Sequence, residues 1–230
     1  MDALSNVNLS EPSLSSGLNP SAIPDAKNEQ TGVSVRYVPE PDHKWFVLRA
    51  SYGRELMVEE ALIASGIYAY VPKHYVYREV NGKPKKVLEK LISNLVFVYL
   101  TPHDAEVLVR NNDPQASSPC PQLAPILSYY YNHFTEIVGG YNPPLTVLCA
   151  EMENFIRLTA TQDENIMMLQ EGDFRYKSDD EVVVTAGQFK DVRGRVIRAH
   201  GQQRVLVSLT GLCLCATAYI PSAFLQKVDS

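Results

Sequence analysis

The sequence is poor in the residues that build disulfide frameworks and metal centres. Its 230 residues include four cysteines, at positions 120, 149, 213 and 215, and no two of them form a C-x-x-C pair. No histidine stands near them at the spacing of zinc ligands. These absences exclude a zinc knuckle and a dithiol redox motif, so we expect reduced thiols. Cys213 and Cys215 alternate with leucines along an expected strand, and we expect them to be inert.

Long apolar runs and an excess of basic residues are also missing. The sequence contains no run of about 18 apolar residues, and its N-terminus lacks the features of a signal peptide. It carries 21 Lys and Arg against 26 Asp and Glu, which gives a formal net charge of −5. Such a chain does not coat nucleic acid by bulk electrostatics, so any nucleic-acid contact must be local. We expect a cytoplasmic protein without a membrane segment.

The common catalytic signatures are absent as well. The sequence has no G-x-S-x-G, no G-x-x-x-x-G-K-[ST] and no H-E-x-x-H motif, and its five histidines are scattered without a pairing pattern. We therefore predict no active site, no metal and no cofactor. The expected role is binding rather than catalysis.

The first two thirds of the chain divide into a polar leader and an α+β domain. Residues 1–42 are rich in Ser, Asn, Pro and acidic residues, which predicts a disordered leader. Hydrophobic periodicity then predicts a strand at 44–50, a helix at 52–67, a hairpin turning at Asn81-Gly82, a strand at 95–100, a helix at 105–110, a strand at 126–135 and a helix at 149–159. This order favours an antiparallel sheet with flanking helices over residues 43–161.

The remainder is predicted to be all β. Residues 162–178 lack clear periodicity and are expected to be a linker, and residues 179–230 are expected to form a small SH3-like barrel. Between the β-branched runs 182–185 and 204–209, Gly187 and Gly194 are expected to supply the positive φ of turns. The segment Gly187–Val196 resembles the KOW motif, a strand-turn-strand signature of SH3-like barrels.

With both parts in view, residues 44–228 resemble the NusG family, in which an NGN domain, a linker and a KOW domain follow one another. The resemblance is carried by Lys44–Ala50 with Gly53 and Glu55, by Tyr70-Val71-Pro72 and by Leu91–Val98. Where the family commonly shows an aromatic pair and Pro-Gly-Tyr, this chain has Ile92, Ser93-Asn94 and Leu95. In overall build the chain is most similar to the UpxY group of Bacteroides, which are antiterminators of capsular polysaccharide operons.

The resemblance implies an apolar hollow on the NGN sheet that receives the tip of the clamp helices of RNA polymerase. By motif position, its candidate lining residues are Tyr70, Ile92, Leu95 and Phe97. Alternating apolar residues on a strand are equally typical of a core. A buried structural role for each of them therefore stays open.

Two further sets of residues are candidates for nucleic-acid or partner contact. The first set surrounds the hairpin and comprises Lys73, Arg78, Lys83, Lys85 and Lys86; the resemblance implies contact with the non-template DNA strand, and the alternative is a solvated hairpin tip. The second set comprises Phe189, Lys190, Arg193 and Arg195; it is expected to contact nascent RNA, a ribosomal protein or a termination factor. Phe189 is equally compatible with a core position.

The function that the resemblance implies is transcription antitermination. A monomeric NusG-like factor would bind elongating RNA polymerase and suppress pausing or termination across a long operon, such as one for surface polysaccharide synthesis. The alternative is a KOW-type RNA-binding or ribosome-associated protein.

Overall fold

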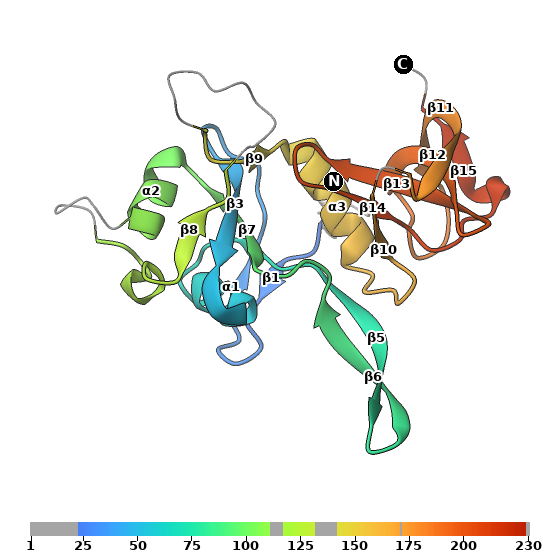
Figure 1. The fold of residues 1–230 in the computed structure, drawn as a ribbon. Helices are drawn as coiled ribbons and strands as arrows, with labels where there is room; N and C mark the ends of the chain where they lie inside the picture. The colour runs from blue at the N-terminus through green and yellow to red at the C-terminus, as the bar shows by residue number, and fades with distance from the viewer. Residues whose placement is uncertain (1–22, 111–116, 132–141, 171, 229–230) are drawn as a thin grey trace, which may run out of the picture.

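The computed structural model describes residues 23–110, 117–131, 142–170 and 172–228 of the chain. An N-terminal antiparallel sheet with helices and an antiparallel C-terminal sheet lie on either side of helix α3 (Cys149–Thr159) (Figure 1). A long hairpin projects away from both sheets. The predicted α+β class is confirmed.

The N-terminal sheet has the strand order β4-β7-β3-β8, and β9 also pairs with β3. Its strands are β3 (Lys44–Ala50), β4 (Ala69–Tyr70), β7 (Leu95–Leu100), β8 (Leu127–Tyr129) and β9 (Thr146–Val147). Every residue of β7 is buried, which fits its continuous apolar sequence. The strands predicted at 44–50 and 95–100 are confirmed, and the end of the strand predicted at 126–135 lies outside the described residues.

Helices cover both faces of this sheet. Besides α3, they are α1 (Glu55–Ala64) and α2 (Pro102–Arg110), with short 3-10 turns at Ser51–Gly53 and Pro121–Leu123. A third 3-10 turn, Ser222–Phe224, precedes the last strand of the C-terminal part. Phe97 lies opposite Val47 in the β3–β7 register, and its ring centroid is 5.8 Å from that of Phe155 in α3. Helix α3 therefore covers this face. Val96 and Val98 point to the opposite face and are fully buried, which leaves α1 and α2 to cover it.

The N-terminal segment differs from the predicted disordered leader. Residues 23–42 are ordered, and they include a two-stranded ribbon of β1 (Ala26–Lys27) and β2 (Ser34–Val35). The ring of Tyr37 lies 5.6 Å from Trp45 and 4.9 Å from Tyr99, so this polar segment gains an aromatic anchor on the sheet. Residues 1–22 lie outside the described part of the chain.

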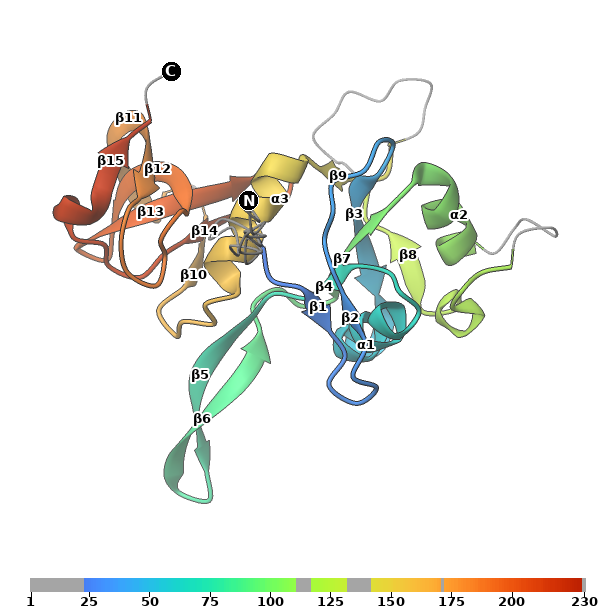
Figure 2. The ribbon, with the colours of Figure 1, turned by 180° about the vertical axis from the view of Figure 1, so that it is seen from behind.

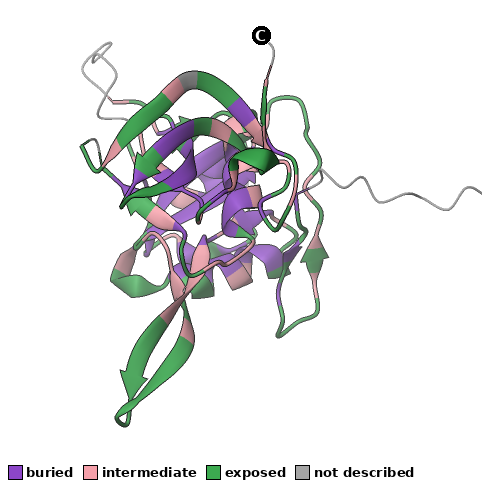
Figure 3. Ribbon diagram, turned by 90° about the vertical axis from the view of Figure 1, so that its right-hand side faces the viewer, coloured by how far each residue is buried: buried purple, intermediate pink, exposed green. Residues whose placement is uncertain are grey.

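The projecting hairpin consists of β5 (Lys73–Val80) and β6 (Lys83–Lys90), paired from Lys73↔Lys90 to Val80↔Lys83. Asn81 and Gly82 have φ values of 54° and 73°, the left-handed conformation that a two-residue type I′ turn requires. The predicted hairpin is therefore confirmed. Most of its outer half is exposed to solvent, as the green hairpin in Figure 3 shows.

The C-terminal sheet has the strand order β10-β14-β13-β12-β11-β15, and every pairing is antiparallel. The strands are β10 (Met167–Leu169), β11 (Phe174–Val184), β12 (Arg193–Ala199), β13 (Gln202–Leu209), β14 (Cys213–Ala216) and β15 (Leu225–Lys227). The segment 162–178 that was expected as a linker contains β10 and the first residues of β11. Apolar side chains of both sheets form one contiguous core cluster.

Gly194 has a different role from the predicted one. Gly187 does adopt a turn conformation, with φ of 82°, but Gly194 lies within β12 opposite Val182. A Cβ atom on Gly194 would come within 2.0 Å of the carbonyl oxygen of Leu206. Glycine is required here because the neighbouring backbone approaches closely, and not because the chain turns.

We predict that Gly194→Ala lowers the free energy of unfolding by about 1–3 kcal/mol, because the strands must shift to admit the methyl group. Urea denaturation followed by near-UV circular dichroism measures this change. Ser208→Ala, on the exposed face of the neighbouring strand β13, serves as the control and is expected to change stability by less than about 0.5 kcal/mol. Equal stability of Gly194→Ala and Ser208→Ala would contradict the close approach of the Leu206 backbone to Gly194.

Candidate interaction surfaces

The four residues proposed for the polymerase-binding hollow separate into two pairs. Phe97 is fully buried against Phe155, and the hydroxyl groups of Tyr70 and Thr159 are 2.6 Å apart. Both residues of this pair therefore pack beneath α3. In the described conformation, Phe97 and Tyr70 pack between the N-terminal sheet and α3 and do not form an open surface.

Ile92 and Leu95, the second pair, line a cavity of about 380 Å3 that we call the recess. The N-terminal part also contributes Arg49, Ser93, Asn94 and Tyr130, and the Arg49 guanidinium carbon lies 5.6 Å from the centre of the Tyr130 ring. The opposite wall belongs to the C-terminal sheet and consists of Met168, Leu212 and Cys213. The recess is thus an interdomain cavity, with one wall supplied by each sheet.

A buried carboxylate, that of Glu55, fixes the backbone of Asn94 at the edge of the recess. Glu55 is fully buried at the start of α1, where it accepts a hydrogen bond from the backbone N–H of Asn94 and another from the Lys90 ammonium at 2.8 Å. Asn94 has φ of 63°, so it takes the left-handed conformation that glycine adopts readily. Burial raises the pKa of Glu55, but the hydrogen bonds and charge of its partners outweigh this effect and lower that pKa overall.

Three of the five basic residues proposed for DNA contact are engaged in ion pairs. The pairs are Lys73–Glu59 at 2.6 Å, Arg78–Glu89 at 2.7 Å and Lys86–Glu164 at 3.1 Å. Lys83 and Lys85, next to the turn, have no ion-pair partner among the residues that the structure describes. The free positive charge of the hairpin is therefore concentrated at its tip.

The four candidates in the C-terminal part are not grouped either. Phe189 is only 3% exposed and packs in the core, which is one of the two roles left open for it. Lys190 is exposed near the turn that precedes β12. Arg193 and Arg195 line a groove of about 1340 Å3 between α3 and the C-terminal sheet. The guanidinium carbon of Arg195 lies 5.9 Å from the centre of the Tyr176 ring, a residue that the sequence patterns did not single out.

Polar side chains of α3 fasten it to the C-terminal sheet. The Asn154 amide accepts from the backbone N–H of Arg193 at 2.8 Å and donates to the backbone carbonyl of the same residue at 2.5 Å. Glu151 accepts hydrogen bonds from the backbone and the hydroxyl of Thr210, at 3.0 and 2.7 Å. Figure 2 shows α3 at this junction from behind. Sequence patterns gave no signal for these contacts, because polar residues on a helix face resemble a solvated surface.

The described residues hold no group of three or more His, Cys, Asp or Glu side chains that is arranged to bind a metal ion, and their four cysteines are free. Among the same residues, no helix has the length and apolar character needed to cross a bilayer.

The N-terminal sheet and its helices have the NGN-like architecture of a class of transcription factors. The family model described as "Transcription termination factor nusG" matches residues 43–156. The chain therefore belongs to the NusG family, which consists of non-enzymatic transcription factors, and membership implies binding to RNA polymerase. A search of curated proteins found no match.

We predict that Glu55→Gln lowers the free energy of unfolding at pH 7 by about 1–3 kcal/mol, since it leaves Lys90 and the Asn94 amide without a carboxylate. The folded-state pKa of Glu55 lies below its ordinary value of 4.5, so this stabilisation is fully present above pH 4.5 and declines as the pH falls through the folded pKa. Chemical denaturation of both proteins between pH 3 and pH 8 measures the difference. A stability difference between wild type and Glu55→Gln that grows as the pH falls would contradict a lowered pKa of Glu55.

Proposed function

We propose that this chain is an antitermination factor that rides on elongating RNA polymerase in the cytoplasm and suppresses pausing or termination across one long operon. Resemblance to the UpxY group favours an operon for surface polysaccharide synthesis. The C-terminal sheet corresponds in this proposal to an SH3-like KOW domain. The observation that carries the proposal is the recess at Ile92 and Leu95, within the region that matches the family.

The recess suits a helix tip in size and chemistry. Ile92 and Leu95 supply apolar surface, and Arg49 with Tyr130 supplies a rim that combines apolar and polar groups. Burial of apolar area at about 25 cal/mol per Å2 provides the affinity, before the ordering costs of association. Binding of the clamp helices would favour the closed clamp of the polymerase and hence its elongating state.

The C-terminal sheet competes with the polymerase for the recess. Leu212, Cys213 and Met168 occupy the side from which a helix tip would enter. Polymerase therefore binds the fraction of molecules in which α3 and the C-terminal sheet have separated. Weaker hydrogen bonds at Asn154 and Glu151 raise this fraction and with it the apparent affinity.

We predict opposite effects for two variants in binding to purified RNA polymerase, measured by biolayer interferometry. Ile92→Glu places a charge in the recess and weakens binding at least tenfold. The double variant Glu151→Ala/Asn154→Ala loses four hydrogen bonds to the C-terminal sheet and strengthens binding about tenfold.

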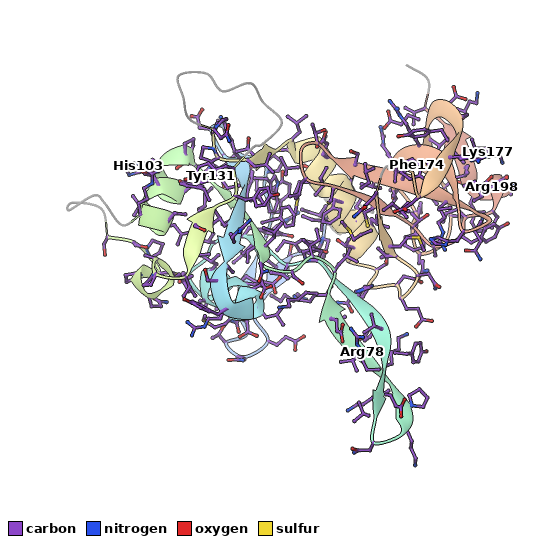
Figure 4. The ribbon with its side chains drawn as sticks, in the orientation of Figure 1. Arg78, His103, Tyr131, Phe174, Lys177 and Arg198 are labelled. Carbon is purple, nitrogen blue, oxygen red and sulfur yellow. The ribbon has the colours of Figure 1, made fainter. Side chains whose placement is uncertain are left out.

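His103→Ala is the control, because His103 lies on α2, away from the C-terminal sheet (Figure 4). Wild-type affinity of Ile92→Glu would refute the recess as the polymerase site. Unchanged affinity of the double variant would refute competition by the C-terminal sheet. Recovery of ribosomal subunits instead of polymerase from cell extract would favour the alternative of a ribosome-associated protein.

For the hairpin we propose contact with the non-template DNA strand through its tip. Tyr77 is 61% exposed and lies directly opposite Lys86, while Lys83 and Lys85 lie closer to the tip on the other face of the ribbon. An exposed ring and unpaired cations on one narrow ribbon suit the bases and phosphates of a single strand. Lys86 already pairs with Glu164, so we expect it to contribute less to DNA binding than Lys83 and Lys85 do.

We predict that Lys83→Glu/Lys85→Glu reduces distal transcripts of the controlled operon in a deletion strain carrying the variant gene. Sequencing of total RNA measures the ratio of distal to proximal reads. The charge-matched control is Lys27→Glu/Lys44→Glu, two exposed cations on the N-terminal part. Wild-type ratios at equal protein levels would exclude the hairpin tip from DNA contact.

A further inference from the structure

Two carboxylates of helix α1 hold the base of the β5–β6 hairpin. Glu59 accepts hydrogen bonds from the Lys73 ammonium at 2.6 Å and from the backbone N–H of Val71 at 2.8 Å. Glu55 accepts from the Lys90 ammonium at 2.8 Å and from a backbone N–H at the edge of the recess. Each carboxylate therefore binds one lysine of the hairpin and one backbone amide just outside it, where the chain enters β5 or leaves β6.

The four charged groups, which we call the α1 anchor, match in spacing. Lys73 and Lys90 lie directly opposite each other in the β5–β6 register. Opposite residues of two strands have Cβ atoms about 4.5–5.5 Å apart, and like charges in this position destabilise a hairpin. Glu55 and Glu59 are four residues apart on α1, a relation that places Cβ atoms about 5–6 Å apart on one side of a helix. One turn of α1 thus supplies a counterion for each lysine.

The carboxylates of the α1 anchor are buried on a helix that is itself fixed by the core. Glu55 is fully buried, Glu59 is 7% exposed, and Val58 and Leu62 of the same helix are fully buried. A buried ion pair adds little net stability, because the loss of hydration offsets much of its attraction. Loss of one partner alone is costly, since it leaves the other charge buried and unpaired. Such pairs are therefore better suited to fix one geometry than to stabilise the fold.

The hairpin also contacts the connection after α3, but through weaker interactions. The backbone N–H of Tyr75 donates to the carbonyl of Gln162 at 3.1 Å, and Lys86 pairs with Glu164 at 3.1 Å. The side chains of Lys86 and Glu164 are 48% and 35% exposed, so solvent screens their attraction. The buried contacts of the hairpin base are therefore those with α1, which belongs to the N-terminal part of the molecule.

The outer half of the hairpin depends on its base for its direction. Residues 77–80 and 83–86 are exposed, as the green outer half of the hairpin in Figure 3 shows. Each strand has eight residues, which corresponds to a length of about 26 Å at about 3.3 Å per residue. A rotation of about 10° at the base would move the tip by about 4–5 Å over this length. Such a shift exceeds the length of a hydrogen bond, so contacts made by the tip require a fixed base.

We propose that Glu55 and Glu59 are positioning residues that hold the hairpin in one direction relative to the recess. Glu55 serves both features, because it binds Lys90 at the hairpin base and the backbone of Asn94 at the edge of the recess. The N-terminal part keeps the hairpin in this direction whether or not the C-terminal sheet is docked. The role in transcription rests on the proposed function: polymerase at the recess and DNA at the hairpin tip are then bound across a constant distance.

The test measures the distance between the hairpin and α2 by double electron–electron resonance, on the full chain without polymerase or nucleic acid. Spin labels are attached to ketone-bearing residues introduced at Glu79 and His103, which are both exposed. This chemistry leaves the four free cysteines unlabelled. For the wild-type anchor we expect a single narrow distribution of distances.

The anchor-neutral variant combines Glu55→Gln/Lys90→Met with Glu59→Gln/Lys73→Met. It removes both ion pairs without leaving a buried charge unpaired, so we expect it to fold and to keep the near-UV circular dichroism of the wild type. Its distance distribution is expected to be about twofold broader or more, because the base of the hairpin is free to rotate. Lys73→Arg/Lys90→Arg retains both charges and is expected to retain the narrow distribution.

The matched control is Arg78→Met/Glu89→Gln, which neutralises an ion pair of 2.7 Å within the hairpin itself. Arg78 lies beyond the hairpin base, as Figure 4 shows. This control is expected to leave the distance distribution unchanged. A broad distribution for the wild type, a narrow one for the anchor-neutral variant, or equal broadening by the control would overturn the positioning role.

A second comparison separates α1 from the C-terminal sheet as the element that fixes the hairpin. Glu151→Ala/Asn154→Ala removes hydrogen bonds between α3 and the C-terminal sheet and leaves the α1 anchor intact. We expect this variant to keep the narrow distribution of the wild type. Broadening equal to that of the anchor-neutral variant would show that the C-terminal sheet holds the hairpin, and would overturn the assignment to Glu55 and Glu59.

The consequence for transcription is measured separately, in the deletion strain. At equal protein levels, the anchor-neutral variant is expected to lower the ratio of distal to proximal reads about threefold or more. A wild-type ratio in spite of broadened distances would overturn the need for a fixed direction. The distances are measured on the isolated chain, and Lys83→Glu/Lys85→Glu tests DNA contact with the α1 anchor intact, so failure of the anchor and failure of the proposed function are distinguishable.

Discussion

Helix α3 is the element on which the arrangement of the molecule depends, because it binds both sheets at once. Its apolar face buries Phe155 against Phe97 of the N-terminal sheet. Its polar face forms two-point hydrogen bonds, from Asn154 to the backbone of Arg193 and from Glu151 to Thr210. The first contact is a core contact, and the second adds polar bonds at the margin of the apolar cluster that both sheets share.

The recess has one wall from each sheet because this helix holds the two sheets together. Ile92 and Leu95 belong to the loop and strand that Glu55 fixes from below, whereas Leu212 and Cys213 arrive with the C-terminal sheet. In the proposed function, polymerase binding and interdomain docking draw on the same apolar surface. The balance between them would then respond to the hydrogen bonds at the α3 interface, each worth about 1 kcal/mol.

Local patterns in the sequence predicted much of the fold. The period of apolar residues gave α3 at residues 149–159, and Asn81-Gly82 gave the hairpin, because in both cases neighbours along the chain determine the conformation. The order of residues 23–42 was missed because it depends on the contact of Tyr37 with Trp45 and Tyr99, which are distant in sequence. The same applies to Gly194, whose requirement comes from Leu206 on the next strand. Of the candidate sites, Ile92 and Leu95 meet at the recess, whereas tertiary contacts bury Phe97 and neutralise most of the hairpin cations.

The hairpin and the C-terminal sheet are linked through the short connection after α3. On the hairpin side, the backbone N–H of Tyr75 donates to the carbonyl of Gln162 at 3.1 Å, and Lys86 pairs with Glu164. On the other side, Gln188 donates to Asp163 at 2.6 Å, and Arg204 donates to the carbonyl of Asn165 at 2.9 Å. A nucleic-acid phosphate that took Lys86 would release Glu164 and so loosen one attachment of this connection. In the proposed function, contact at the hairpin and opening of the recess would thus be coupled through neighbouring residues, and such a coupling is reciprocal.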